Sequence, residues 1–161
     1  MEKFKNMIQS IVNYIVQVAS TFYKWLDKQY QIKAREEQRQ LAENRIPLLR
    51  SEFYQFMVAY PMPAQYGMDV AANLILVTCI STTRYELQIP LKTRETLSPY
   101  NLKLQFTKNL EQNLNLCKAE LYERCVNGLP MHYQLLPCLH IAEVYQAEPG
   151  YIRIIVDLEG C

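Results

Sequence analysis

The first 45 residues are the part of the chain that most restricts its fold. Residues 2–45 contain neither glycine nor proline, and the first proline of the 161-residue chain is Pro47. Helices usually end at such residues, so the stretch predicts one helix of about 43 residues, far longer than the average helix of a globular protein.

Apolar residues repeat along this predicted helix in steps of four and three, which is the spacing of a coiled-coil seam. The members of this repeat, called the apolar stripe below, are Phe4, Ile8, Ile11, Ile15, Val18, Phe22 and Trp25. A second apolar row beside the stripe consists of Val12, Val16, Ala19, Tyr23, Leu26 and Tyr30. The two rows together make an apolar face wider than a two-stranded seam requires.

Three interpretations of this helix are open. Met7–Tyr23 is uncharged and flanked by lysines, as in a membrane span, but it is short for one and its polar side would face lipid. The helix could instead lie in a membrane surface. It could also pack in a bundle, with copies of itself, with a partner or with its own domain. The bundle is favoured, because the stripe keeps one rhythm from the uncharged half into the charged half.

The expected lengths sharpen the functional inference. A helix of about 43 residues is roughly 60–65 Å long, whereas a domain made of the remaining residues would be near 35 Å across. The most apolar part of the helix is the end far from that domain. We therefore expect something outside the C-terminal domain to cover it.

The chain after the long helix predicts a compact α+β domain. Ile46-Pro47 predicts a break, because the residue before a proline disfavours the helical conformation, and a second helix follows over 47–60. A strand buried on both faces is predicted at 74–80. The next strand, 85–91, is predicted at the sheet edge because it contains Pro90.

The second half of this domain predicts a helix and a hairpin. Ser98-Pro99 suits a helix start and Gly128 a helix end, and strands over 138–146 and 151–158 flank a Pro-Gly turn. The predicted order is α-α-β-β-α-β-β, with a small, mainly antiparallel four-stranded sheet packed against one or two helices. The predicted division is an amphipathic assembly helix over 1–46 and an α+β domain over 47–161.

Charge gives a weak indication of partners. The chain has 17 basic and 16 acidic side chains, a net charge of +1, with 9 basic and 5 acidic ones in residues 1–50. Acidic residues are interleaved with these basic ones, which is typical of a solvated helix face, and we do not expect direct nucleic-acid binding. The candidates for anion contacts, with phosphates or lipid head groups, are Lys24, Lys28, Lys33, Arg35 and Arg39.

The cysteines and histidines offer one weak metal candidate. Five cysteines without a Cys-x2-Cys pair indicate a reducing compartment, so we expect a cytoplasmic location, with membrane association as the alternative. Four zinc-competent side chains fall within 16 residues but lack the usual close pairs, and we expect no metal there. They are Cys125, His132, Cys138 and His140.

No sequence motif predicts a reaction. The chain has four glycines and no phosphate-binding loop, nucleophile elbow or paired-acid motif, so we expect neither an enzyme nor a cofactor. The sequence predicts a non-catalytic assembly protein, whose N-terminal helix drives oligomerisation or docking into a larger complex, with itself or another protein as partner. The alternative is an adaptor or sensor that the same helix attaches to a membrane.

Overall fold

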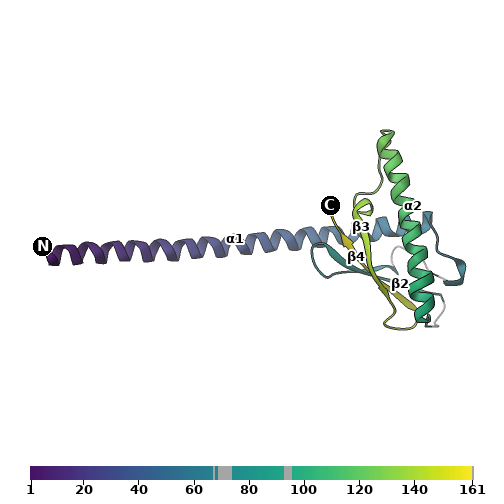
Figure 1. The fold of residues 1–161 in the computed structure, drawn as a ribbon, viewed down its shortest axis with the longest axis horizontal. Helices are drawn as coiled ribbons and strands as arrows, with labels where there is room; N and C mark the ends of the chain where they lie inside the picture. The colour runs from purple at the N-terminus through teal and green to yellow at the C-terminus, as the bar shows by residue number, and fades with distance from the viewer. Residues whose placement is uncertain (67, 69–73, 93–95, 161) are drawn as a thin grey trace. The chain divides into compact units, whose positions relative to one another are not determined.

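The computed structural model describes residues 1–66, 68, 74–92 and 96–160 (Figure 1). The elements along these residues are α1 (Glu2–Ala59), η1 (Ala64–Tyr66), β1 (Leu76–Cys79), β2 (Arg84–Pro90), η3 (Asn101–Phe106), α2 (Thr107–Val126), η4 (Leu136–Cys138), β3 (Leu139–Tyr145) and β4 (Tyr151–Leu158). A long helix, an antiparallel sheet and a second helix therefore confirm the predicted α+β class.

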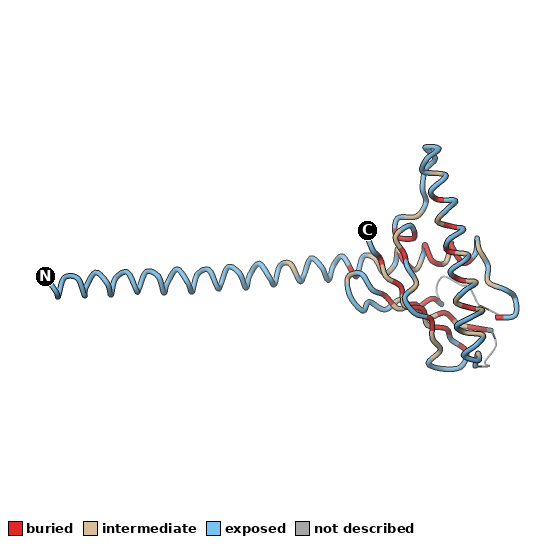
Figure 2. Tube along the Cα trace, viewed as in Figure 1, coloured by how far each residue is buried: buried red, intermediate tan, exposed pale blue. Residues whose placement is uncertain are grey.

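The chain divides into two compact units, Met1–Gln40 and Leu41–Cys161. The first unit is helix alone, and every residue from Met1 to Lys33 is exposed. The second unit holds the sheet and the hydrophobic core, where the buried segments gather in Figure 2. The first unit thus has no core of its own.

Helix α1 continues through Pro47, so the predicted break at Ile46-Pro47 is wrong. A proline inside a helix lacks the N–H that would bond the preceding turn, which costs about 3 kcal/mol. Two arginines on either side of it tie the helix to the β1–β2 region: Arg45 Nη1 donates to the Thr82 carbonyl at 2.8 Å, and Arg50 Nε to the Ile75 carbonyl at 2.9 Å. These bonds and the buried face after Pro47 offset the lost bond.

The sheet has the strand order β1-β2-β4-β3, and all neighbours are antiparallel. The predictions that 74–80 forms a strand buried on both faces and that 85–91 forms an edge strand are therefore both wrong. β1 is a mostly exposed edge strand, and β2 lies between β1 and β4. Pro90 is the last residue of β2, beyond the β1 register, which ends at the pair Leu76–Gln88. The β1–β2 pairing therefore loses no hydrogen bond through the N–H that Pro90 lacks.

The β3–β4 hairpin follows the predicted boundaries closely, and β4 matches 151–158. Gly150 has a φ of +85°, as the third position of a type II turn requires. Alternation along β2 and β4 then places Leu87 opposite Ile154, and Ile89 opposite Ile152, on one apolar face.

Two helices contribute side chains to the core above this face. α1 supplies Leu49, Phe53 and Phe56, each with no exposed surface. The α2 region supplies Phe106, Leu110, Leu114, Cys117 and Leu121, which follow one another in steps of four and three residues. The second unit therefore buries one face of its sheet under helices, while the other face remains polar.

The α2 region begins and ends at the predicted residues. Ser98 Oγ accepts a bond from the Asn101 N–H at 3.2 Å, which caps the helical turn opened by Pro99. At the other end the Gly128 N–H bonds the Cys125 carbonyl and the Leu129 N–H bonds the Arg124 carbonyl. Gly128 has a φ of +69°, and the pair of bonds is a Schellman motif.

Candidate interaction surface

The apolar stripe lies on the part of α1 that belongs to the first unit. All seven of its side chains are exposed, by 45% at Ile8 and by up to 61% at Phe4. The large side chains of the second row, from Val12 to Tyr30, are exposed as well. Soluble chains seldom leave so large a continuous apolar surface open to water, and such surfaces mark interaction sites. The pale-blue colour of this helix in Figure 2 marks its residues as exposed.

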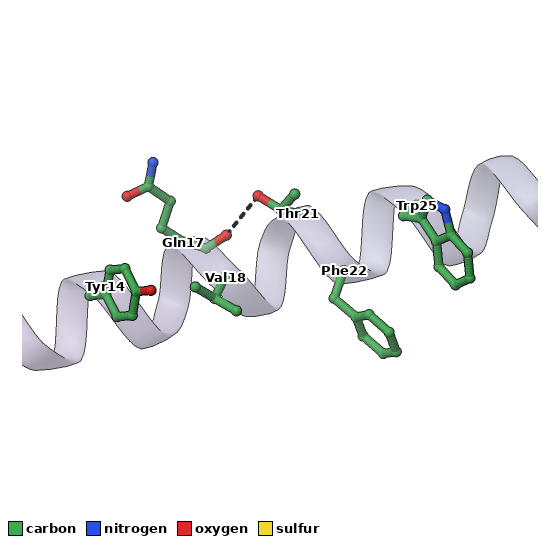
Figure 3. A pocket seen from close by; sticks show the side chains of 6 residues that line it. All are labelled: Tyr14, Gln17, Val18, Thr21, Phe22 and Trp25. Atoms are coloured by element: carbon green, nitrogen blue, oxygen red, sulfur yellow. Dashed lines mark hydrogen bonds between the residues drawn. The ribbon is translucent and has the colours of Figure 1, made fainter.

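The aromatic end of the stripe lines a shallow, mostly apolar hollow together with Tyr14, Gln17 and Thr21 (Figure 3). Val18, Phe22 and Trp25 extend to one side of the helix, away from Gln17 and Thr21. The rings of Phe22 and Trp25 are stacked, with centroids 6.1 Å apart. Aromatic side chains supply much of the binding energy at protein interfaces, so this end is the best anchor that the surface offers.

The opposite side of the same helix is polar and bonds to itself. Gln9 Nε2 donates to Asn13 Oδ1 at 3.0 Å, and Gln31 Nε2 donates to Asp27 Oδ2 at 3.2 Å. This division into an apolar and a polar side is what a helix packed along one side needs. Within the described part of the chain, no helix has both the length and the apolar character needed to cross a membrane.

The five basic candidates are exposed along α1 and do not converge on one site. Lys24 and Lys28 lie four residues apart, as do Arg35 and Arg39. Arg39 pairs with Glu36 at 2.8 Å, one of the interleaved acids that the sequence shows. The arrangement fits a solvated helix face better than a built anion site.

The four weak metal candidates lie on separate elements. Cys125 is exposed in the last turn of α2, His132 lies in the loop after it, and His140 is exposed on β3. Cys138 is disulfide-bonded and offers no thiolate. Among the described residues, no three histidine, cysteine or acidic side chains come close enough to hold a metal ion.

A small cavity of about 180 Å³ gathers reactive residue types that the sequence does not group. Tyr60, Cys117, Glu120, His132 and Tyr133 line it, and the Tyr60 hydroxyl donates to the Glu120 carboxylate. Burial raises the pKa of the Cys117 thiol to about 11. The thiol is therefore protonated at neutral pH and is a poor nucleophile.

Glu52 is a buried acid that sequence reasoning missed. Its side chain lies on the core side of α1 and is 2% exposed. Its carboxylate accepts bonds from the backbone N–H groups of Gln134 and Leu135, which holds the loop before η4 against α1. Burial raises the pKa of Glu52, and the backbone bonds from Leu135, Gln134 and Leu136 partly oppose the rise. Its position three residues after Leu49 and four before Phe56, on the apolar helix face, was the available signal.

The open face of the sheet carries ion pairs. Arg84 binds Asp157 through two bonds of 2.7 and 3.0 Å, which lower the pKa of the Asp157 carboxyl. On the neighbouring register, Arg153 lies 3.6 Å from Glu86, and the Tyr145 hydroxyl donates to Glu86. Such pairs are typical of the solvated face of an antiparallel sheet.

Among the described residues, the apolar stripe is thus a long exposed apolar surface on α1. Comparison of the sequence with protein families and curated proteins, and of the fold with solved structures, found no match.

Proposed function

We propose that this protein is a non-catalytic assembly protein whose N-terminal helix joins it to other protein chains through the apolar stripe. The observation that carries the proposal is the uninterrupted exposure of the stripe from Phe4 to Trp25, on a unit with no core of its own. Covering this surface removes apolar area from water, at roughly 25 cal/mol per Å². The α+β domain is then what the helix brings into the assembly.

Charge placed on the stripe tests the proposal. Ile11→Asp with Ile15→Glu puts two carboxylates on the stripe, one helical turn apart. Gln9→Glu with Asn13→Asp adds the same charges at the same spacing on the polar side, away from the hollow at Phe22 and Trp25, and is the matched control. We expect the stripe variant to lower the mass of the full chain in detergent-free solution, measured by sedimentation, and the control to behave as the wild type.

Trp25 provides a second readout, because it is the chain's one tryptophan and lies on the stripe. In the assembled wild type, acrylamide should quench its fluorescence weakly, and quenching should increase in the stripe variant. The proposal is overturned if the wild type is a multimer and the two stripe charges change neither its mass nor its quenching. Assembly would then use another surface.

A membrane surface is the second candidate, because the exposed apolar side of α1 also resembles that of a helix lying in an interface. Lys24 and Lys28 would then face anionic head groups. Flotation of the full chain with anionic vesicles separates the two functions. If the chain floats with anionic vesicles but not with neutral ones, the membrane function is favoured. If it stays at the bottom of the gradient with both kinds of vesicle, the protein assembly is favoured. The cytoplasmic location stays a prediction.

A further inference from the structure

The stripe can be assigned to the positions of a heptad repeat, in which a and d face the partner helices. Steps of three lead from a to d and steps of four from d to a. The a positions are then Ile8, Ile15 and Phe22, and the d positions are Phe4, Ile11, Val18 and Trp25. The members of both sets are exposed along the first unit.

The side chains at these positions disfavour a pair of helices. Two-stranded coils prefer a β-branched residue at a and leucine at d, whereas isoleucine at both positions shifts the preference to three or four strands. Here Ile11 and Val18 put β-branched side chains at d, next to Ile8 and Ile15 at a. The second row widens the apolar side further, with Val12 and Leu26 at e. A helix in a bundle of three or more has neighbours on two sides and covers such a width.

The charge pattern favours identical helices as the partners. Charged residues at e and g are the usual means by which a coil selects a different chain. From Met7 to Leu26 every e and g position is uncharged, namely Met7, Val12, Tyr14, Ala19, Thr21 and Leu26. Identical copies place like residues near each other, and a charge there would repel its own counterpart. The segment Met7–Tyr23 presents no such charge.

The available area suffices for a stable interface. The seven stripe side chains are each about half exposed. Covering them completely would remove on the order of 800 Å² per chain from water, which is the share of one partner in a standard interface. The second row adds to this area when more than one neighbour is present.

We propose that the N-terminal helices of at least three copies of this chain associate through the stripe in one coiled-coil bundle. The inference rests on the proposed function, because it names the partner of the same surface. The bundle spans Phe4 to Trp25, and Lys5 near its start is the one charged side chain at an e or g position within that span. Beyond it, Glu36 and Arg39 fall at a and d, where they would meet their own copies, so the apolar seam does not extend to them.

Native mass spectrometry of the purified full chain tests the copy number. We expect a species of at least three times the 19.0 kDa of one chain. The variant carrying Ile11→Asp and Ile15→Glu should move to 19.0 kDa, and the control carrying Gln9→Glu and Asn13→Asp should keep the wild-type mass. Circular dichroism at equal concentration confirms that both variants keep the α+β domain folded.

The outcomes separate this inference from the proposed function. A wild-type chain that is a monomer or a dimer overturns the bundle of at least three copies, and leaves the stripe open to a different protein. A multimer of three or more that the stripe charges do not reduce overturns both, because another surface then holds the copies together.

A second variant tests the heptad assignment itself. Ile11→Leu with Val18→Leu restores leucine at d and leaves isoleucine at a, which favours two strands. The substitutions keep the surface apolar, so non-specific hydrophobic association would leave the mass unchanged. We expect a shift toward the dimer, and an unchanged mass would overturn the assignment of Ile11 and Val18 to d.

Discussion

The two units of this chain handle apolar side chains in opposite ways. Leu41–Cys161 buries its own under two helices, with Leu87 and Ile154 paired in the sheet and Phe53 above them. Met1–Gln40 carries a comparable density of large apolar side chains and leaves them exposed. Both use amphipathic helices, so the difference lies in what is available to cover the apolar side. Leu41–Cys161 covers its apolar side chains within the chain, and we propose that other copies cover those of Met1–Gln40.

Phenylalanine-to-alanine substitutions in the two units give the largest contrast. Phe53→Ala empties a fully buried site and should lower the free energy of unfolding by about 3–5 kcal/mol. Phe22→Ala on the stripe should leave the unfolding of the α+β unit unchanged and lower the mass of the assembly at a given concentration. Urea unfolding and sedimentation of both variants measure the two effects. Equal losses of unfolding free energy would break the comparison, because the stripe would then belong to the core of the domain.

Pro47→Ala tests whether helix α1 is continuous at residue 47. Alanine restores the N–H that proline lacks, inside a helix already held by Arg45 and Arg50. The free energy of unfolding should rise by up to about 3 kcal/mol, which is the difference between proline and alanine in a helix interior. A loss of stability on urea unfolding would contradict a continuous helix at this residue.

Substitution of Glu52 tests how much its buried hydrogen bonds contribute to the free energy of unfolding. Glu52→Ala leaves the N–H groups of Gln134 and Leu135 without their acceptor and should lower the free energy of unfolding by about 1–3 kcal/mol. Glu37→Ala, at an exposed acid of the same helix, should change it little. An equal loss in both variants would show that the buried bonds contribute nothing beyond helix propensity.

The pH dependence gives Glu52 its own signature. Burial raises its folded pKa above the model-peptide value of 4.5, so the folded chain binds more protons than the unfolded chain between these two pKa values. The free energy of unfolding contributed by Glu52 therefore falls as pH rises through that window. Subtracting the urea unfolding profile of Glu52→Gln from that of the wild type should show this fall. A difference that rises with pH would contradict it.

Local signals in the sequence predict the parts of the fold that depend on neighbouring residues. Ser98 and Gly128 mark the ends of the α2 region, and Gly150 marks the turn before β4, because caps and turns are set by a few consecutive φ and ψ angles. The spacing of Leu110 and Leu114 predicts the buried side of α2 for the same reason. The stripe itself was visible as a repeat, and its exposure is the observation that the structure adds.

The tertiary structure decided the features that depend on distant contacts. β1 has the apolar sequence of an inner strand, yet it lies at the edge, because strand order is set by which partners pair and not by the strand's own residues. Pro47 reads as a helix break, yet bonds to Thr82 and Ile75 hold the helix together across it. The role of Glu52 likewise needs a loop more than 80 residues away.

By itself, the sequence determined a long amphipathic helix, its apolar repeat and the caps and turns of the α+β unit, because each follows from side-chain spacing or from a few adjacent dihedral angles. The tertiary structure decided the strand order, the continuity of α1 and the burial of Glu52, because these depend on groups that only the folded chain brings together. The partner of the stripe is inferred from the chemistry of its exposed apolar surface.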